Sequence, residues 1–442
     1  METGLTDPLS KVITERETAR QHLRLGRLDQ AEQVYSRILE THPEEIEALA
    51  FLAGCALRRG QSARGIGLLE QACRAKPEDA QILGNLGIAY DHAGREKEAI
   101  ETLRRALAKA PDLFLARLHL GGLLEKAGQD YDALVAYFGA ITTARRQGQW
   151  LSEATTPAAL HDKVLHAMRY GEQGRRRLFS ELLTPLRARH GGESLRRVEQ
   201  CLAAYLGDVA AQSPDSRQRP KFLYFPGLPA RPYLDRAGIP WLAALEQQTE
   251  TIRSEARSVL QTEQGLEPFL KFSSPGEVPK FLRGAEHPPA WDAFFFYRHG
   301  EHYADNARRC PHTSSILESL PLVRIREHAP EICFSVLKPG TTILPHHGVT
   351  NTRIVVHLPL IVPEDCALRV AGEARPWQEG RALVFDDTYE HEAWNRSDQT
   401  RVILLMDAWH PELTEVERAA IADLVISIGG FNRDTQSGPD TH

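Results

Sequence analysis

The chain has 442 residues, a length that predicts more than one folded domain, because a single hydrophobic core rarely extends over so many residues. Apolar residues make up 42% and charged residues 25%, a balance typical of globular proteins rather than of disordered or fibrous chains. The formal net charge is -6 and acidic and basic residues are intermixed, so the charge pattern does not favour nucleic acid or an anionic membrane surface as a partner.

The spacing of the cysteines and the composition of the first 30 residues indicate the cellular compartment. The six cysteines are scattered along the chain and form none of the close pairs that zinc sites and redox motifs need. The first 30 residues lack the apolar core of a signal peptide, and no apolar run reaches the roughly 18 residues of a membrane span. We therefore expect a cytoplasmic protein without a membrane partner.

Residues 9–145 contain a repeat with a period of 34 residues. Glycines and prolines keep this period without a slip, at Gly26, Gly60, Gly94 and Gly128 and at Pro43, Pro77 and Pro111. Within each unit, apolar residues recur at helical spacing, a glycine ends the first helix and a proline follows the second. Each unit is therefore predicted to be a helical hairpin.

This stretch resembles the tetratricopeptide repeat family, although the early Trp usual in that family is absent. Small residues at the helix crossings let neighbouring helices approach closely, so that successive hairpins stack into an α-solenoid with a concave groove. We expect this groove to bind a peptide or protein substrate. The alternative is a stabilising or dimerising array that has no ligand.

A second domain is predicted after a helical connector, which gives a multidomain α plus β protein. Residues 146–217 keep helical periodicity without the 34-residue register. Between 218 and 428, short runs rich in β-branched and aromatic residues, such as EICFSVLKPG and TRVILLMDAWH, predict a double-sheet jelly roll, also called a double-stranded β-helix. A last helix is predicted near 414–428, which leaves 429–442 as a flexible tail.

Five histidines lie at the ends of the predicted strands: His346, His347, His357, His391 and His410. A lone histidine on a strand is usually a hydrogen-bonded core or rim residue, so none of them indicates a metal by itself. In a jelly roll, however, His346 and His391 can reach one pocket. Such a pair would suit Fe(II).

Arg401 lies in the apolar segment TRVILLMD, where an unpaired guanidinium would be costly to bury. It therefore needs an anionic partner. One interpretation is a structural salt bridge to an acid of the same domain. The other, which the nearby histidines favour, is an anionic cosubstrate whose carboxylate Arg401 grips bidentately.

Three segments resemble the signature blocks of the aspartyl/asparaginyl β-hydroxylase family: FSVLKPGTTILPHHGVTNTRIVVHLPLIVP, GRALVFDDTYEHEAWN and TRVILLMDAWHPELT. The resemblance implies a dioxygenase that uses Fe(II), 2-oxoglutarate and O₂ to hydroxylate a peptide or protein at the β-carbon of Asp or Asn. Relatives that oxidise lipids leave a small molecule or an acyl chain as an alternative substrate. A third interpretation is a non-catalytic scaffold on an oxygenase fold.

By position, the resemblance assigns His346 and His391 as iron ligands and places Gly348 where other 2-oxoglutarate oxygenases have a carboxylate ligand. His347 competes with His346, but neighbouring strand residues point to opposite faces, so only one of the two can reach the metal, and we choose His346. The acidic pair Asp386–Asp387 would be another source of an acid ligand, although such a corner more often binds backbone amides.

The resemblance also assigns the cosubstrate site. Ser335 and Arg401 match residues that hold the distal carboxylate of 2-oxoglutarate, and His357 matches one that assists the proximal carboxylate. Val355 stands where the family commonly has a second arginine. This difference predicts weaker cosubstrate binding, by about 1.5–3 kcal/mol, unless another cation reaches in, such as Arg353 or Arg369.

Overall fold

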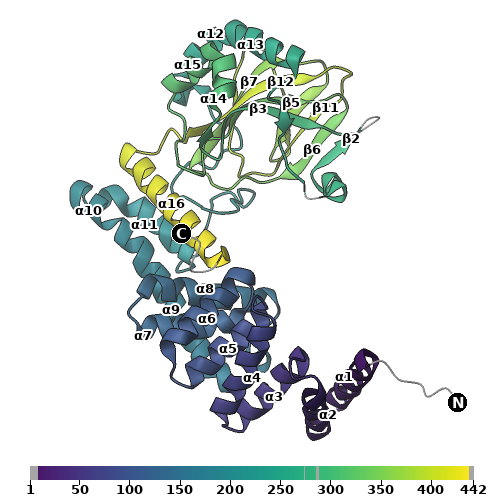
Figure 1. Cartoon of the computed structure of the whole chain (residues 1–442). Coiled ribbons are helices and arrows are strands. Elements are labelled where there is room, and N and C mark those ends of the chain that lie inside the picture. Colours follow the sequence, from purple (N-terminus) through teal and green to yellow (C-terminus); the bar gives the residue numbers. More distant parts are fainter. Residues whose placement is uncertain (1–7, 273, 285–287, 438–442) are drawn as a thin grey trace, which may run out of the picture. The chain divides into compact units, whose positions relative to one another are not determined.

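The computed structural model describes residues 8–272, 274–284 and 288–437, which divide into two compact units (Figure 1). The first unit comprises the described residues up to Leu178 together with those from Gly429 onward, and the second comprises Phe179–Ile428. None of the described helices combines the length and the apolar composition that crossing a membrane requires.

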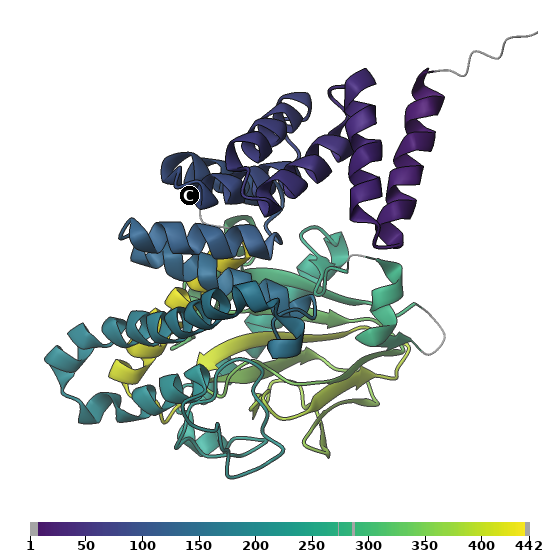
Figure 2. The same ribbon diagram turned by 90° about the horizontal axis from the view of Figure 1, so that it is seen from below.

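The first unit is an array of helical hairpins that follow one another along the chain (Figure 2). Its helices are α1 Pro8–Arg24, α2 Leu28–Thr41, α3 Ile46–Arg58, α4 Ser62–Ala75, α5 Ala80–His92, α6 Glu96–Lys109, α7 Phe114–Lys126 and α8 Asp130–Arg146. The four periodic glycines all follow the first helix of a pair and have φ between 69° and 75°, a left-handed conformation that favours glycine. The predicted repeat is thus confirmed.

Close helix contact explains the small residues of the repeat. A Cβ atom on Gly87 would lie 2.6 Å from Cγ of Leu103, and one on Gly121 would lie 2.6 Å from Cδ1 of Tyr137. Neither contact is sterically allowed, so α5 and α7 can pack on their partners only with glycine at these positions.

The predicted connector 146–217 does not form a unit of its own. Helix α9, His161–Leu182, buries Val164 and Ala167 against Leu118 and Tyr137 of the array, so its first part belongs to the first unit. Helices α10 (Thr184–His190) and α11 (Arg196–Leu206) belong to the second. Because α9 does not keep the 34-residue register, its packing on the array could not be predicted from the repeat.

The prediction of a flexible tail over 429–442 is wrong for 429–437, because helix α16 runs from Glu415 to Ser437. Arg117, which is fully buried on α7, donates hydrogen bonds to the carbonyl oxygens of Thr435 at 2.8 Å and Gln436 at 3.2 Å. These carbonyls at the helix end have no partner within the helix, so Arg117 stabilises the last turn. Residues 438–442 lie outside the described part of the chain.

Two antiparallel sheets form the core of the second unit (Figure 1). The larger has the order β1-β3-β5-β12-β7-β10, with β4 beside β3, and the smaller has the order β2-β6-β11-β8-β9. The larger sheet consists of β1 Glu267–Pro268, β3 Trp291–Arg298, β4 Glu301–His302, β5 Ile332–Leu337, β7 Arg353–Ile361, β10 Leu383–Phe385 and β12 Arg401–Trp409. The smaller consists of β2 Leu282–Gly284, β6 Thr341–His346, β8 Cys366–Val370, β9 Glu373–Pro376 and β11 His391–Asn395. Strands β5 to β12 pass back and forth between the sheets, which is the predicted jelly roll.

Helices cover the outer face of the larger sheet, namely α12 Leu242–Gln247, α13 Thr249–Thr262, α14 Ala304–Arg309 and α15 Pro311–Ser319. On β12, the even-numbered residues Val402, Leu404 and Met406 pack in the core formed with these helices. The odd-numbered residues from Arg401 to Asp407 line a pocket on the other face. Because side chains alternate along a strand, one apolar segment both anchors the helices and carries polar groups into the pocket.

Candidate active site

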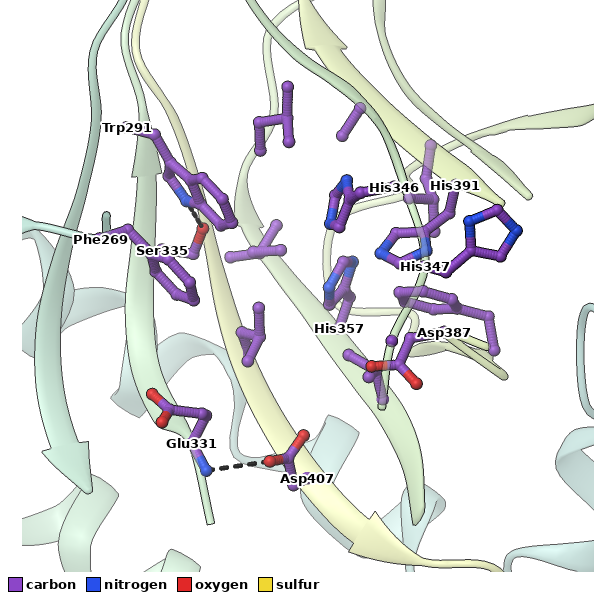
Figure 3. Close-up of a pocket in the computed structure, with 18 of the residues that line it drawn as sticks. Phe269, Trp291, Glu331, Ser335, His346, His347, His357, Asp387, His391 and Asp407 are labelled. Carbon is purple, nitrogen blue, oxygen red and sulfur yellow. Dashed lines mark hydrogen bonds between the residues drawn. The ribbon is translucent and has the colours of Figure 1, made fainter. Parts of the chain in front are cut away.

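A pocket of about 270 Å³ lies within the jelly roll (Figure 3). Its lining includes all five residues that the sequence singled out for iron and cosubstrate: Ser335, His346, His357, His391 and Arg401. They come from β5, β6, β7, β11 and β12, which the fold brings together from both sheets. Their individual roles remain predictions.

His346 and His391 lie opposite each other where β6 ends and β11 begins, with ring centroids 4.0 Å apart. The Nδ1 atom of His346 lies 2.8 Å from the carbonyl oxygen of Leu344, and that of His391 lies 3.0 Å from the carbonyl oxygen of Tyr389. A carbonyl can only accept, so each Nδ1–H is the donor. The lone pair of the neutral ring is then on Nε2, which is the arrangement that a metal ligand needs.

Burial keeps both rings uncharged. It lowers the pKa of His346, and together with the neighbouring His346 it lowers the pKa of His391 to about 3. Neutral imidazoles fit a divalent cation such as Fe(II). In the described ranges, no three His, Cys, Asp or Glu side chains are grouped so as to hold a metal. The pair of imidazoles is the predicted donor set, and it would leave coordination positions for other ligands.

His347 and His410, the two histidines not assigned to iron or cosubstrate, lie in different places. His347 lines the same pocket and remains a competing ligand for its neighbour. His410 lies beyond β12, where its Nδ1 accepts a hydrogen bond from the backbone N–H of Glu412 at 3.2 Å. Its backbone N–H donates to the carbonyl oxygen of Thr352. His410 is therefore a turn residue rather than part of the pocket.

The two neighbouring acids also differ in position. Asp386 accepts hydrogen bonds from the backbone N–H of Thr388 at 2.9 Å and from its hydroxyl at 2.5 Å, so it stabilises the turn. Asp387 lines the pocket, and a Cβ atom on Gly348 would lie 2.1 Å from its carboxyl carbon. The Asp387 carboxyl thus fills the space next to Gly348 into which an acidic side chain at that position would extend.

Arg401 creates an anion site at the other end of the pocket. Its guanidinium is 1% exposed and donates from Nη1 to the carbonyl and hydroxyl oxygens of Ser335, both at 3.3 Å. No aspartate or glutamate of the described chain pairs with it, and Nε has no hydrogen-bond partner there. Burial lowers its pKa only to about 10, so Arg401 stays charged near neutral pH. A buried cation with unused donors fits a carboxylate ligand.

Neither Arg353 nor Arg369 replaces the arginine that the family commonly has at the position of Val355. Val355 lines the pocket beside His357, whose Nδ1 has no hydrogen-bond partner among the described residues. Arg369 is not part of the lining and forms an ion pair with Glu392 at 2.6 Å. Arg353 lines the pocket, but its guanidinium forms ion pairs with Asp387 and Asp407. Neither Arg353 nor Arg369 is therefore free to take the place of the missing arginine, and Arg401 is the cation that acts on His357.

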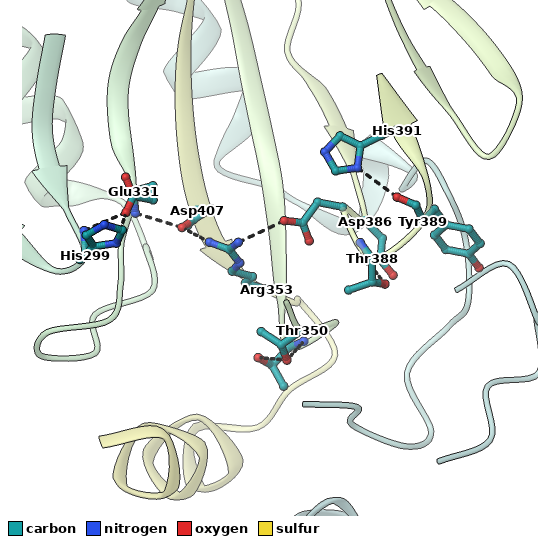
Figure 4. A network of polar contacts seen from close by, with 11 residues as sticks. His299, Glu331, Thr350, Arg353, Asp386, Thr388, Tyr389, His391 and Asp407 are labelled. Atoms are coloured by element: carbon teal, nitrogen blue, oxygen red, sulfur yellow. Dashed lines mark hydrogen bonds and ion pairs between the residues drawn. The ribbon is translucent and has the colours of Figure 1, made fainter. Parts of the chain in front are cut away.

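Three carboxylates of the pocket lining, Glu331, Asp387 and Asp407, form what we call the acidic wall (Figure 3). Figure 4 shows Arg353 next to Asp407 and His299 next to Glu331. Arg353 donates to Asp407 and, at 3.1 Å, to Asp387, while the backbone N–H of Glu331 donates to Asp407 at 3.0 Å. Burial is the main cause that raises the pKa of both Glu331 and Asp387 to about 7. Arg353 is thus the one cation paired with the wall's carboxylates within the described pocket.

Sequence reasoning missed Glu331 and Asp407 and two indoles of the lining, Trp291 and Trp377. Asp407 could have been found, because it follows Arg401 by an even number of residues on one strand and so shares its face. Trp291 had no such signal. Its indole N–H donates to the hydroxyl oxygen of Ser335 at 2.9 Å through the pairing of β3 with β5.

Comparison with known families agrees with this geometry. Residues 246–411 match the family model of aspartyl/asparaginyl β-hydroxylases. The chain carries a domain of this family. Residues 16–80 and 56–114 match the tetratricopeptide repeat model, so the β-hydroxylase domain follows a tetratricopeptide array.

Relatives of the β-hydroxylase domain have different named substrates. This chain is 35% identical over 219 residues to aspartate β-hydroxylase domain-containing protein 2 of Homo sapiens (48% of this chain, 56% of the relative). Aspartyl/asparaginyl β-hydroxylase of Homo sapiens is 34% identical over 179 residues (40% and 22%). The ornithine lipid ester-linked acyl 2-hydroxylase of Rhizobium tropici is 35% identical over 183 residues (41% and 61%). The chain spans less than two thirds of each of these proteins.

Proposed function

We propose that this protein is an Fe(II)- and 2-oxoglutarate-dependent dioxygenase that hydroxylates a peptide or protein at the β-carbon of an Asp or Asn residue. Membership of the β-hydroxylase family supports a hydroxylase. The observation that carries the cofactor assignment is the buried Arg401 guanidinium, which pairs with no acid of the described residues and lies in the same pocket as His346 and His391. A dicarboxylate would neutralise it at one end and leave the other end free for a metal.

The residues would divide the work as follows. His346 and His391 would hold iron, and Arg401 and Ser335 the distal carboxylate of 2-oxoglutarate. When bound, iron and 2-oxoglutarate supply the oxidising power that inserts an oxygen atom of O₂ into a C–H bond. Ser335 already accepts hydrogen bonds from Trp291 and Arg401, so its own proton is free to bind a carboxylate.

The apolar side chains of the pocket would exclude water from the reacting centre. The lining carries Ile343 and Leu368 from the smaller sheet and Phe385 and Ile403 from the larger sheet. A dry pocket strengthens the pairing of Arg401 with a carboxylate. It also protects a reactive oxidant from side reactions.

The repeat unit would supply contacts with a protein substrate. It contains a hollow of about 630 Å³ lined by residues of α5, α7, α8 and α9, among them Asp91, His119, Glu125 and Lys163. Tetratricopeptide arrays present such surfaces to extended segments, so we place substrate docking here. All six cysteines are free thiols, in accord with action in the reducing cytoplasm.

An acyl chain is the second candidate substrate. The relative from Rhizobium tropici is named for acyl hydroxylation, and the pocket has a largely apolar lining. The repeat array and the acidic wall favour the peptide instead. A non-catalytic scaffold is the third candidate, but it leaves the buried charge of Arg401 without a role.

The test is an anaerobic calorimetric titration of the full chain with Fe(II) and 2-oxoglutarate, followed by O₂ and measurement of succinate. Peptides rich in Asp and Asn and a lipid extract are added in separate reactions. We expect joint binding of iron and 2-oxoglutarate, and succinate formation that peptide stimulates and lipid does not. Stimulation by lipid alone would favour the acyl substrate. Metal binding without 2-oxoglutarate binding would favour the scaffold.

A further inference from the structure

We infer that the acidic wall selects the target side chain: it favours one that donates hydrogen bonds, such as an asparagine amide or a cationic group, and disfavours an aspartate carboxylate. This inference rests on the proposed function and narrows its substrate class. It assigns Glu331, Asp387 and Asp407 to specificity.

The acidic wall is separate from the anion site of the same pocket. Arg401 and Asp407 lie on the same face of β12, six residues apart, which corresponds to roughly 20 Å along a strand. Figure 3 shows Ser335 and Trp291 toward one end of the pocket and Glu331 and Asp407 toward the other. Asp387 lies near His357 and His391. A cosubstrate bound at Arg401 would therefore leave the wall to the substrate.

The charges of the wall do not cancel. Three carboxylates face the pocket, and both terminal nitrogens of Arg353 already donate, one to Asp387 and one to Asp407. His299 also contacts Glu331, at 2.8 Å, but burial and the nearby Arg298 lower its pKa, so it adds no cation near neutral pH. Arg298 also lies near Glu331, but it forms an ion pair with Glu267 at 3.2 Å, so at about pH 8 the wall keeps an excess of negative charge.

The wall also has an unused acceptor. Asp387 lines the pocket and is 6% exposed, and its buried Oδ1 has no hydrogen-bond partner among the described residues. A buried carboxylate oxygen without a donor is unfavourable, so a ligand that brings an N–H group would be stabilised there. A second carboxylate would instead face like charges in a medium of low dielectric constant.

The first experiment compares peptide pools that share random flanking sequences and differ only in a fixed central residue: Asn, Lys or Asp. The full chain, supplied with Fe(II), 2-oxoglutarate and O₂, is tested at about pH 8, where a buried acid with a pKa near 7 is ionised. Mass spectrometry measures the oxygen gained by each pool. We expect the Asn or Lys pool to exceed the Asp pool by on the order of tenfold or more. Equal or faster oxygenation of the Asp pool overturns the inference.

Glu331→Gln removes one charge of the wall and keeps its shape, and an oxygen acceptor remains for the backbone N–H of His299. We expect the preference over Asp to shrink several-fold in this variant. Glu301→Gln is the matched control, because Glu301 is exposed on β4 and does not line the pocket. An unchanged preference in Glu331→Gln contradicts the assignment.

A second readout needs no turnover. Mn(II) replaces iron in the full chain with 2-oxoglutarate, and proton relaxation is measured for the acetylated N-methylamides of asparagine, lysine and aspartate. We expect the asparagine or lysine probe to relax faster than the aspartate probe. If the probes relax differently but no peptide is oxygenated, the proposed function is rejected, while the selectivity of the acidic wall is retained. Equal relaxation of all probes, or none, rejects the selectivity itself.

Discussion

Gly348 and Asp387 lie so close together that a Cβ atom on the glycine would be 2.1 Å from the carboxyl carbon of the aspartate. The backbone N–H of Gly348 also donates to the carbonyl oxygen of Asp387 at 2.5 Å. The Asp387 carboxylate is in turn held by Arg353 at 3.1 Å. The absence of a side chain at Gly348 is therefore a condition for the ion pair between Asp387 and Arg353.

Gly348→Asp should not create a third metal ligand. We expect it to displace Asp387 from Arg353 and to destabilise the second unit by about 1–3 kcal/mol, the usual cost of overpacking. Chemical denaturation monitored by tryptophan fluorescence would measure the loss. Gly238→Ala is the control, because a Cβ atom on Gly238 meets no neighbour within 4 Å. Wild-type stability together with tighter metal binding would contradict this expectation.

Arg401→Met should weaken 2-oxoglutarate binding by more than about tenfold, because a charge-assisted hydrogen bond contributes about 1.5–3 kcal/mol. Calorimetry on the metal-loaded chain would measure this affinity. Arg369→Met should leave it unchanged, since Arg369 does not line the pocket. If both variants bind 2-oxoglutarate as the wild type does, Arg401 is not the carboxylate site.

His391→Ala should raise the dissociation constant for Fe(II) by more than about 100-fold, because even the loss of an outer partner of a ligand costs about 10- to 100-fold. Anaerobic metal titration would measure it, and circular dichroism would check the fold. His302→Ala, on the exposed strand β4, is the control. Retention of wild-type affinity in His391→Ala would point to a different ligand, and His347→Ala should then be tested.

The contribution of Glu331 to stability should fall as the pH rises from about 4.5 to about 7. Burial raises the pKa of Glu331 from its ordinary value of 4.5 to about 7, so in this window this group binds more protons in the folded chain than in the unfolded chain. The contribution of this group to the free energy of unfolding then decreases with pH and levels off above the folded pKa, whereas buried histidines such as His391, with a pKa of about 3, contribute with the opposite sign. Asp387, with a pKa also near 7, contributes with the same sign as Glu331.

Urea denaturation at several pH values would measure this slope. Five of the six tryptophans lie beyond residue 178, so their fluorescence reports mainly on the second unit. Glu331→Gln should lose the contribution that falls with pH, so between pH 4.5 and 7 its stability should rise more, or fall less, than that of the wild type. Glu301→Gln should keep the wild-type slope. The same dependence of stability on pH in Glu331→Gln and in the wild type would show that Glu331 titrates normally.

Arg117→Ala should release the last turn of α16. The variant leaves the carbonyl oxygens of Thr435 and Gln436 without their donor, which costs about 1–3 kcal/mol for a buried group. Hydrogen exchange should become faster in residues 429–437 and stay unchanged in α3. Arg105→Ala is the control, because Arg105 makes one long bond, 3.4 Å, to the carbonyl oxygen of Pro77.

The sequence predicted those parts of the molecule that depend on local pattern. The glycine period located the hairpins, and the strand texture together with the family blocks predicted the jelly roll and the residues that meet in its pocket. The last turn of helix α16 is stabilised by Arg117, which lies 318 residues from Thr435 in sequence. A contact between residues so far apart leaves no local sequence pattern. The polar residues 429–442 were therefore predicted to be a flexible tail.

The acidic wall was missed for the same reason. Arg353 meets Asp407 only because β7 pairs with β12, and it meets Asp387 only because the chain returns past β10. Each of these residues alone is typical of a strand end or a turn. Their common neighbourhood is a property of the strand order, which neither composition nor spacing determines.

The alternation along β12 bears on how this pocket can change during evolution. A point substitution at Ile403 or Leu405 would alter the pocket and leave the layer under the helices intact, so new selectivity can arise one residue at a time. Deletion of one residue would instead exchange the two faces and place the Arg401 charge against the helices. Relatives with different substrates should therefore differ on this strand by replacement and not by changes in its length.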